Sequence, residues 1–422
     1  MYKNIKVGLS LSGGGYRAAA FHLGTLKKLH QLGLLQYIDV ISAVSGGAIV
    51  ASYYMLHKDN FEEFETLFKK KLKKGVMEPV FALCGLVGLL AIGLAFFYGP
   101  LLLVLILFLF FYTYFVLPIN QLVEWRYRQH FYGNISLKDI PKHPILAINA
   151  TDTEFGKPFV FTRDMIYHSE YRPQNGELVF STNKIPLAKA VMASSCIPIF
   201  NPVKIGRKEQ RIDMGKPVYL MDGGLFDNQG IHRLSKSKGR LHTMYNIISN
   251  AGNTKWNPDA CYNIISSLYK GMNILMKRIQ SMQNQHNMYL GVDCRDRFAF
   301  FELDWENSDR AIYRFVDHLE MGNISEELIK QHNISAKDVR SLREGNDQEK
   351  VVARDHIAEK LKENIGWSDI VKQMPLVEER KIAVNISTNL TALSEKKIDV
   401  LMKQASWMTE MQVRIYLPSL LN

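Results

Sequence analysis

One serine of the chain stands where its hydroxyl would be exposed for nucleophilic attack. Ser45 follows the short apolar run Val40–Val44, which is typical of a strand, and precedes two glycines and a helical pattern. A serine on such a sharp strand-to-helix turn has an exposed hydroxyl, and the positive end of the helix points at it. The small neighbours Ala43, Gly46 and Gly47 allow the close packing that this turn needs. Because Ala43 stands where the usual G-x-S-x-G pattern has glycine, a purely structural turn stays open for this segment taken alone.

A second segment places three glycines between a strand and a helix. Residues 6–11 alternate as a strand does, Gly13, Gly14 and Gly15 follow, and Ala18–Leu32 has a helical pattern. Glycines let backbone N–H groups converge on one point, and such a nest at a helix N-terminus binds an anion. The anion could be a phosphate or the oxyanion of an acyl-transfer intermediate. The spacings of nucleotide-binding loops are missing from this segment, so we favour the oxyanion.

The third segment ends a strand in a carboxylate. The apolar stretch Val218–Met221 leads into Asp222, Gly223 and Gly224. A carboxylate at a strand end, followed by flexible backbone, can be placed against a nucleophile. Taken alone, the segment could equally be a turn in which Asp222 bonds to its own backbone.

In this order, the glycine nest, the serine turn and the strand-end aspartate resemble the patatin-like phospholipases. That family carries a G-G-G-x-[RK] oxyanion loop, a G-x-S-x-G nucleophile elbow and a D-G-[GA] motif. The matching residues are Gly13, Gly14, Gly15 and Arg17 for the loop, Ser45 and Gly47 for the elbow, and Asp222, Gly223 and Gly224 for the last motif. Residues 150–156 and 193–198 look like two structural signatures of the same fold, and the likeness covers residues 5–57 and about 140–255, with a looser likeness near 388–416.

The resemblance implies an α/β fold, a three-layer α/β/α sandwich with a mainly parallel central sheet. It also implies a catalytic dyad in which Asp222, as general base, takes the proton of the Ser45 nucleophile without a histidine. N–H groups of Gly13–Gly15 would form the oxyanion hole, and Arg17 would fix this loop or attract a phosphate head group. Ser12, Ala18 and Ala43 depart from the family pattern, but none of them replaces a reacting group. No metal or other cofactor is expected, because the family needs none and the sequence offers no ligand cluster.

Two alternatives to this mechanism stay open. A Ser-His-Asp triad could use His232 or His242, which follow Asp222 in the chain order of α/β-hydrolases. Against it, Ser45 lies near the N-terminus, and His232 falls in a basic segment that is typical of a solvated surface. The other alternative is a membrane lipid-binding or scaffold protein without turnover. Such a protein needs neither nucleophile nor base, so the presence of both favours the enzyme.

A long apolar stretch interrupts the predicted catalytic domain. Residues 79–119 contain no charged side chain, and Tyr98-Gly99-Pro100 divides them in two. Each half has about 19 residues, which as a helix is roughly 28 Å long and close to the hydrocarbon thickness of a bilayer. We therefore predict a membrane-inserted helical hairpin, because an even number of crossings keeps Ser45 and Asp222 on one side. A wedge in one leaflet, or a hairpin buried within an oligomer, are the alternatives to spanning.

Charge predicts the side of the membrane and the partner. Lysines at 69, 70, 71, 73 and 74 precede the apolar stretch, and Arg126 and Arg128 follow it, so both ends are expected on the cytoplasmic side. The chain has 52 Lys and Arg against 41 Asp and Glu, a net charge of +11, which favours an anionic membrane surface. Nucleic acid is not expected as a partner, because no nucleic-acid motif accompanies this charge. Four scattered cysteines and the lack of a secretory signal fit the reducing cytoplasm.

The chain of 422 residues is expected to comprise three parts. These are a discontinuous catalytic α/β domain (1–75 and 120–260), the membrane-inserted hairpin (76–119) and a mostly helical C-terminal region (261–422) that completes the domain. In that region we predict helices over Tyr262–Asn287, Asp309–Met321 and Val351–Asn364, a strand over Phe298–Leu303, and an exposed loop over Ser335–Gln348. The expected substrates are membrane phospholipids, lysophospholipids or other acyl lipids, while the sequence leaves the oligomeric state open.

Overall fold

A nine-stranded sheet forms the centre of the protein. The computed structural model describes residues 7–99, 104, 108, 119–171, 179–198, 200–212, 214–236, 239–252, 264–285 and 297–421. The strand order is β5-β4-β3-β2-β1-β8-β9, and β7 pairs with both β3 and β6. The strands are β1 (Val7–Leu11), β2 (Val40–Ala43), β3 (Ile145–Asp152), β4 (Lys157–Phe161), β5 (Ile166–Tyr167), β6 (Val203–Ile205), β7 (Val218–Asp222), β8 (Tyr245–Asn250) and β9 (Phe298–Glu302).

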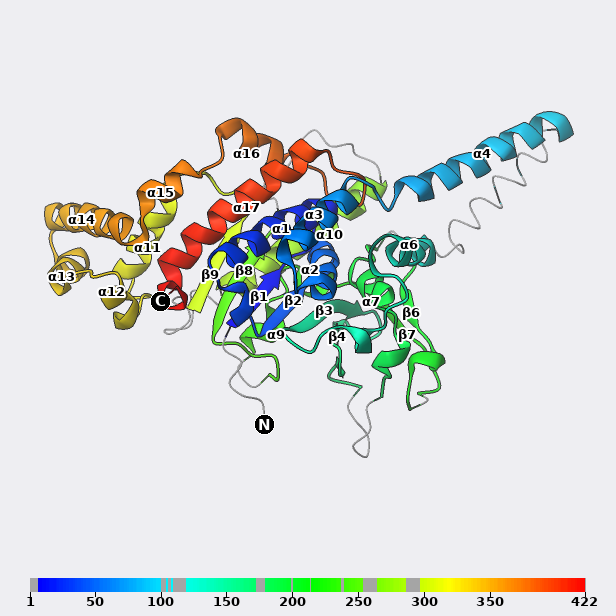
Figure 1. Cartoon of the computed structure of the whole chain (residues 1–422), viewed down its shortest axis with the longest axis horizontal. Helices are drawn as coiled ribbons and strands as arrows, with labels where there is room; N and C mark the ends of the chain where they lie inside the picture. The colour runs from blue at the N-terminus through cyan, green and yellow to red at the C-terminus, as the bar shows by residue number, and fades with distance from the viewer. Residues whose placement is uncertain are drawn as a thin grey trace.

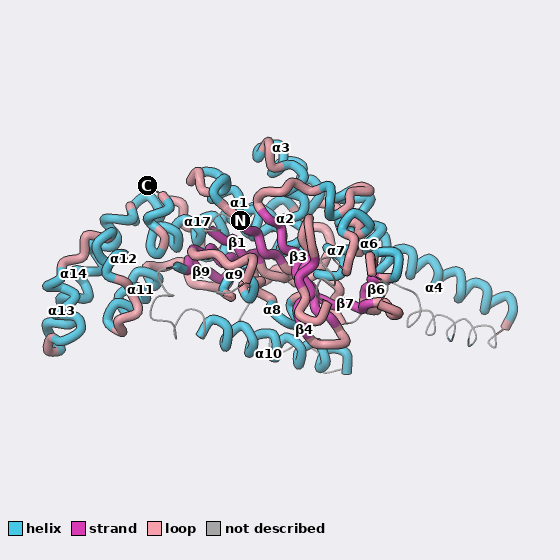
Figure 2. Tube along the Cα trace, turned by 90° about the horizontal axis from the view of Figure 1, so that it is seen from below, coloured by secondary structure: helices cyan, strands magenta, loops and turns pink. Residues whose placement is uncertain are grey.

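Helices cover both faces of the sheet, as expected for the α/β sandwich. The five strands β3, β2, β1, β8 and β9 are mutually parallel, and such strands need cover on both faces. Figure 2 shows α1, α2 and α17 on one side of the sheet and α8 and α10 on the other. The described α-helices are α1 (Gly15–Gln31), α2 (Gly46–His57), α3 (Phe61–Leu72), α4 (Glu78–Tyr98), α6 (Ile119–Tyr127), α7 (Leu187–Ser194), α8 (Gly224–Asp227), α9 (His232–Ser235), α10 (Ile264–Asn284), α11 (Arg310–Glu320), α12 (Glu326–Gln331), α13 (Ala336–Glu344), α14 (Asp347–Ile365), α15 (Trp367–Lys372), α16 (Val377–Val384) and α17 (Glu395–Tyr416).

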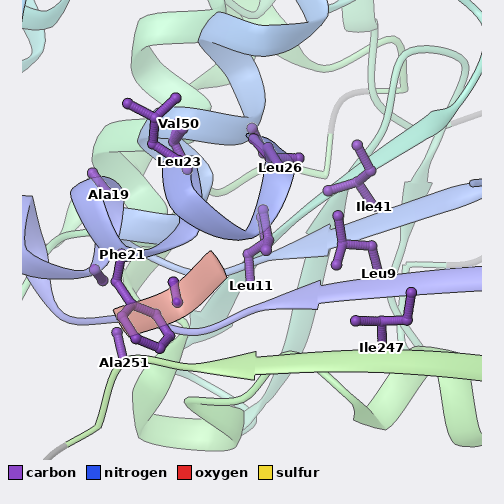
Figure 3. Close-up of a cluster of buried hydrophobic side chains, with 14 of the residues drawn as sticks. Leu9, Leu11, Ala19, Phe21, Leu23, Leu26, Ile41, Val50, Ile247 and Ala251 are labelled. Carbon is purple, nitrogen blue, oxygen red and sulfur yellow. The ribbon is translucent and has the colours of Figure 1, made fainter. Parts of the chain in front are cut away.

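The main core lies between the sheet and the helical layer that contains α1 and α2. Leu9 and Leu11 are two residues apart in β1 and therefore point to the same face of the sheet. In Figure 3 they face side chains of α1, among them Leu26, and all three are fully buried. This packing fixes the ends of β1 and β2, from which the glycine nest and Ser45 extend.

Helix α17 brings the C-terminal region into the same layer, side by side with α1 (Figure 1). The two backbones approach closely at Gly24, where a Cβ atom would lie 2.6 Å from the Cα of Met402. Next to this contact, Lys28 Nζ donates to Glu410 Oε2 at 2.8 Å in a buried ion pair. The C-terminal region thus completes the helical layer that covers β1.

The C-terminal predictions are confirmed with one exception. Strand β9 lies within the predicted strand, and α10, α11 and α14 overlap the three predicted helices. The predicted loop over Ser335–Gln348 is wrong, because α13 occupies most of it. The Ser335 side chain caps this helix by accepting from the Asp338 N–H, and Leu342 is buried. One buried leucine and a cap are enough to form this helix, because α13 packs against α14 and needs no core of its own.

Helix α4 contains the first half of the apolar stretch and projects away from the body of the protein (Figure 1). It ends at the predicted break, where Gly99 has a φ of +92°. Several of its large apolar side chains are exposed, and Phe96 is 89% exposed. None of the helices in the described part of the chain combines the length and apolarity that crossing a membrane requires. The second predicted half, apart from Val104, Phe108 and Ile119, lies outside the described residues.

Candidate active site

The register of the sheet explains why Ser45 and Asp222 meet. Strand β2 pairs in parallel with the first half of β3 and ends with Ala43 opposite Ile148. Strand β7 runs in the opposite direction along the same edge of β3 and ends with Asp222 opposite Ala150. The other edge of β3 is taken by β4. The ends of β2 and β7 therefore point at each other along one edge, and the residues that follow them are brought together.

Ser45 occupies a strained turn at the start of α2. Its φ of 49° and ψ of −115° are rare for a residue with a side chain, as expected of a nucleophile elbow. The turn also demands close backbone contact, since a Cβ at Gly47 would lie 2.7 Å from the carbonyl carbon of Leu11. The backbone N–H of Ser45 donates to the Ser194 hydroxyl at 2.9 Å. This bond holds the backbone of the turn and does not involve the Ser45 hydroxyl.

The Asp222 carboxyl is buried beside the Ser45 hydroxyl. Its side chain accepts a hydrogen bond from the Gly224 N–H at 2.7 Å, and the residue is 6% exposed. Burial raises the pKa of Asp222 to about 7, because desolvation disfavours the charged carboxylate. The hydrogen bonds from the Gly224 N–H and from the Ser45 hydroxyl lower this pKa by less. A carboxylate with a pKa near 7 and a hydroxyl within hydrogen-bond reach can act as a general base.

The glycine nest lies against Ser45, but its three N–H groups are not equivalent. A Cβ atom added to Gly13 would lie 3.3 Å from the Cβ atom of Ser45, so the two residues are in close contact. The Gly13 N–H donates to the carbonyl of Asn228 at 3.0 Å and is therefore occupied. Within the described structure, the N–H groups of Gly14 and Gly15 have no hydrogen-bond acceptor. Their φ angles of +141° and +59° are readily adopted only by glycine, and this conformation leaves two N–H groups for an anion.

Arg17 is directed toward the C-terminal region. Its Nη1 donates to the carbonyl of Ile386 at 3.1 Å, and the residue is 7% exposed. A buried guanidinium that bonds a carbonyl is suited to fixing the adjoining loop. Of the two roles predicted for Arg17, this geometry favours the first over attraction of a head group.

Two residues that brace the site were not predicted as functional. Ser194 accepts from the Ser45 N–H, and its own hydroxyl donates to the carbonyl of Asn149 at 2.6 Å. The Asn149 amide in turn donates to the carbonyl of Ala43 at 3.0 Å. These bonds link α7, β3 and the elbow. Ser194 lies in the stretch 193–198 that the sequence marked as structural, but its bond to Ser45 follows only from the fold.

The histidines of the alternative triad lie elsewhere. The Nδ1 atom of His242 pairs with the carbonyl of Leu234 at 2.8 Å, and the ring of His232 packs edge-on against Phe226. Burial lowers the pKa of His232 to about 4. Neither histidine contacts Ser45 or Asp222 among the described residues, so the geometry favours the dyad over the triad.

Helix α10 packs against α8, which follows β7 directly in the chain. A Cβ atom added to Gly224 would lie 2.7 Å from the methyl group of Met276. The Met276 side chain therefore lies directly beside the aspartate motif. The Gln280 amide donates to Glu302 Oε1 at 3.0 Å and joins the helix to β9. An apolar side chain here could contact an acyl chain bound near Ser45.

The comparison with protein families identifies the family to which the chain belongs. The model of the family described as "Patatin-like phospholipase" matches residues 9–234, more than half of the chain, and includes Ser45, Asp222 and the glycine nest. The chain therefore belongs to the patatin-like phospholipase family, as its motifs predicted. Members of this family are lipid acyl hydrolases. No curated protein sequence matches the chain.

Solved structures that match the chain include a human and a Legionella pneumophila protein. Human GIVD cytosolic phospholipase A2 has a TM-score of 0.50 and 12% sequence identity, over 99% of this chain and 60% of that one. VipD from Legionella pneumophila has a TM-score of 0.32 and 12% identity, over 97% of this chain and 92% of that one. This chain thus spans about three fifths of the length of the human enzyme, and at this identity the likeness concerns the fold alone.

Proposed function

We propose that the protein is a membrane-associated serine lipid acyl hydrolase of the phospholipase A or lysophospholipase type. The observation that carries the proposal is the meeting of Ser45, on its strained elbow, with the buried carboxyl of Asp222. Family membership supports a lipid substrate. A lipid-binding protein without turnover would have no use for a strained serine beside a carboxylate whose pKa is near 7.

The residues would act in the following way. Asp222 takes the proton of the Ser45 hydroxyl as its oxygen attacks the ester carbonyl of a lipid. The oxyanion is stabilised by the N–H groups of Gly14 and Gly15 and by the positive end of α1, which begins at Gly15. The protonated Asp222 then gives its proton to the departing alcohol. A water molecule, activated by the same carboxylate, releases the fatty acid from Ser45.

Membrane association is supported by the exposure of α4 and by its charged flanks. Large apolar side chains on this helix face solvent, which is unfavourable in water and favourable in a bilayer. Lysines at 69, 70, 71, 73 and 74 precede the helix, and cations at such positions attract the anionic cytoplasmic leaflet. We therefore propose that the apolar stretch inserts into the membrane with the catalytic domain on the cytoplasmic side.

Labelling with a fluorophosphonate probe tests the nucleophile. The purified protein should be labelled, and Ser45→Ala should not be, because the probe bonds only to an activated hydroxyl. Asp222→Asn should reduce the hydrolysis of a lysophospholipid at least about 100-fold, because the general base is lost. The double variant His232→Ala/His242→Ala is the matched control and should retain activity.

Three results would contradict the proposal. Equal labelling of the wild type and Ser45→Ala, or labelling of neither, would favour the non-catalytic lipid-binding protein. Loss of activity in the histidine variant, with retention in Asp222→Asn, would favour the triad. Measurement of vesicle binding by the same variants separates these outcomes from membrane association, which none of the substitutions should change.

A further inference from the structure

A cavity lies where the apolar stretch rejoins the body of the protein. Its volume is about 400 Å³, within the range of small-ligand sites. Helix α6, which begins at Ile119 directly after the apolar stretch, lines one wall, and the segment 201–204 lines another. The amide of Asn120 donates to the carbonyls of Asn201 and Pro202 at 2.9 and 3.0 Å, so the two walls are held together. The cavity is therefore part of the fold and does not depend on loop movement.

Cations dominate the lining of this cavity. Arg128, Lys189 and Lys204 line it, against the single carboxylate of Glu124. Arg128 Nη2 donates to Glu124 at 3.2 Å, and Lys189 Nζ lies 2.6 Å from Glu209, which is not among the lining residues. Lys204 is exposed and has no ion-pair partner in the described part of the chain. A guanidinium and an unpaired ammonium that face one cavity form a favourable site for a phosphate.

The side chains at the rim are typical of a membrane interface. Trp125 lines the cavity and is 51% exposed, and the guanidinium of Arg126 lies 5.7 Å from the centre of its ring. Tryptophan, arginine and lysine concentrate at the level of the lipid head groups. We proposed above that the apolar stretch inserts into the bilayer, and α6 begins at the end of this stretch. The cavity would then lie at the depth of the head groups.

The cavity is also near the active site. Helix α7 has Lys189 in its first turn and Ser194, which holds the elbow, at its end. The two residues are five positions apart, which corresponds to roughly 8 Å along a helix. A lipid bound at Lys189 would thus keep Ser45 close to the membrane surface that contains its substrate.

We infer that this cavity binds the phosphate of an anionic phospholipid head group and holds the catalytic domain at the membrane surface. The inference rests on the membrane association proposed above. The bound lipid is assigned as an anchor and not as the substrate.

Sedimentation with phosphatidylcholine vesicles, with and without phosphatidic acid, tests the site on the full-length protein. The variant Arg128→Gln/Lys204→Gln removes two cations of the cavity. The charge-matched control is Lys330→Gln/Lys337→Gln, two exposed lysines on α12 and α13 at the opposite end of the molecule (Figure 1). The cavity variant should lose affinity for phosphatidic acid vesicles about 25-fold, at about fivefold per cation. The control should change by less than about threefold, because its charges lie beyond the screening length of about 10 Å.

The outcomes separate the two proposals. Two results would overturn the site while membrane association stands. In the first, the cavity variant binds the vesicles as well as the wild type does. In the second, the cavity variant and the control variant lose the same affinity. Failure of the wild type to bind any vesicle would overturn both. Thermal unfolding and hydrolysis of a soluble ester should be the same in all three proteins, because neither Arg128 nor Lys204 belongs to the catalytic machinery.

A competition experiment distinguishes the lipid from a soluble phosphate. Inorganic phosphate in the millimolar range should weaken vesicle binding of the wild type only slightly, because it lacks the apolar chains that hold a lipid in place. If inorganic phosphate protects the wild type but not the cavity variant against thermal unfolding, while vesicle binding is equal in both, the cavity binds a soluble phosphate. That result would overturn the lipid assignment.

Discussion

At the scale of single residues, burial determines the chemistry of Asp222. An exposed aspartate would be ionised at neutral pH but too weak a base to take a proton from serine. Desolvation raises its pKa to about 7, and the hydrogen bonds from Gly224 and Ser45 keep the charged form accessible. As a result of this burial, we expect a rise in pH to increase the activity and to decrease the free energy of unfolding.

Activity should follow the ionisation of Asp222. Because the base must be deprotonated, kcat/KM for a soluble ester should rise through a pH of about 7 and fall about tenfold per pH unit below it. A pH–rate profile of the wild type checks this. A rate that stays constant down to a pH of about 5 would show that another group is the base.

Stability should change in the opposite direction. The pKa of Asp222 is about 7 in the folded protein and 3.8 in the absence of burial, so its contribution is fully present below the lower value and lost as pH rises through the higher. Asp222→Asn removes this dependence. Between pH 5 and pH 8 the wild type should lose on the order of 2–3 kcal/mol relative to this variant, as measured by denaturant unfolding. Parallel stability curves would contradict the burial of a titrating carboxyl.

At the scale of elements, the contact between α1 and α17 holds the glycine nest in place. Helix α1 begins in the nest, and Arg17 of its first turn bonds the C-terminal region at Ile386. The close approach at Gly24 allows the two helices to pack along their length. The C-terminal helix therefore supports the site although its own residues do not react.

Replacement of Gly24 by alanine should disturb this contact. Its new Cβ would collide with the backbone of Met402, which cannot move aside as a side chain can. We expect a loss of about 1–3 kcal/mol in the free energy of unfolding. The matched control is Gly271→Ala in α10, where a Cβ meets nothing within 4 Å and the helix should gain up to about 1 kcal/mol. Equal effects of the two substitutions would show that the contact between α1 and α17 is loose.

At the scale of the whole molecule, the protein has two different ends (Figure 1). The apolar helix α4 projects from one end, and the polar helices α11–α16 form the other. Both ends expose large apolar side chains, but only α4 combines them with basic flanks and with the cavity at α6. Under the membrane association that we propose, this asymmetry would turn α4 toward the bilayer.

Charges placed on α4 should abolish membrane binding without unfolding the protein. Leu89 and Phe96 are exposed, so Leu89→Asp/Phe96→Asp should change the free energy of unfolding by no more than about 1 kcal/mol. Its affinity for vesicles should fall at least about 100-fold, because each apolar side chain is worth roughly 1.5–3 kcal/mol in the bilayer. The control Met321→Asp/Val352→Asp changes two exposed apolar residues at the other end and should bind as the wild type does. Equal binding by both variants would contradict insertion of α4.

The sequence by itself determined the parts of the site that depend on local geometry. A serine on a tight strand-to-helix turn, glycines before a helix and an aspartate at a strand end are each encoded by a few neighbouring residues, because backbone strain and close approach restrict the residue types. The C-terminal helices and β9 followed from periodicity in the same way. The predicted loop over Ser335–Gln348 failed because capping by Ser335 and packing against α14 outweigh low apolar content.

Only the tertiary structure decided how these parts meet. The ends of β2 and β7 face each other because both pair with the same edge of β3, a register that no local pattern encodes. The same long-range packing occupies the Gly13 N–H with Asn228, braces Ser45 through Ser194 and buries Asp222. Local sequence restricts backbone conformation, whereas burial, and with it the pKa of a carboxyl, depends on everything that packs around it.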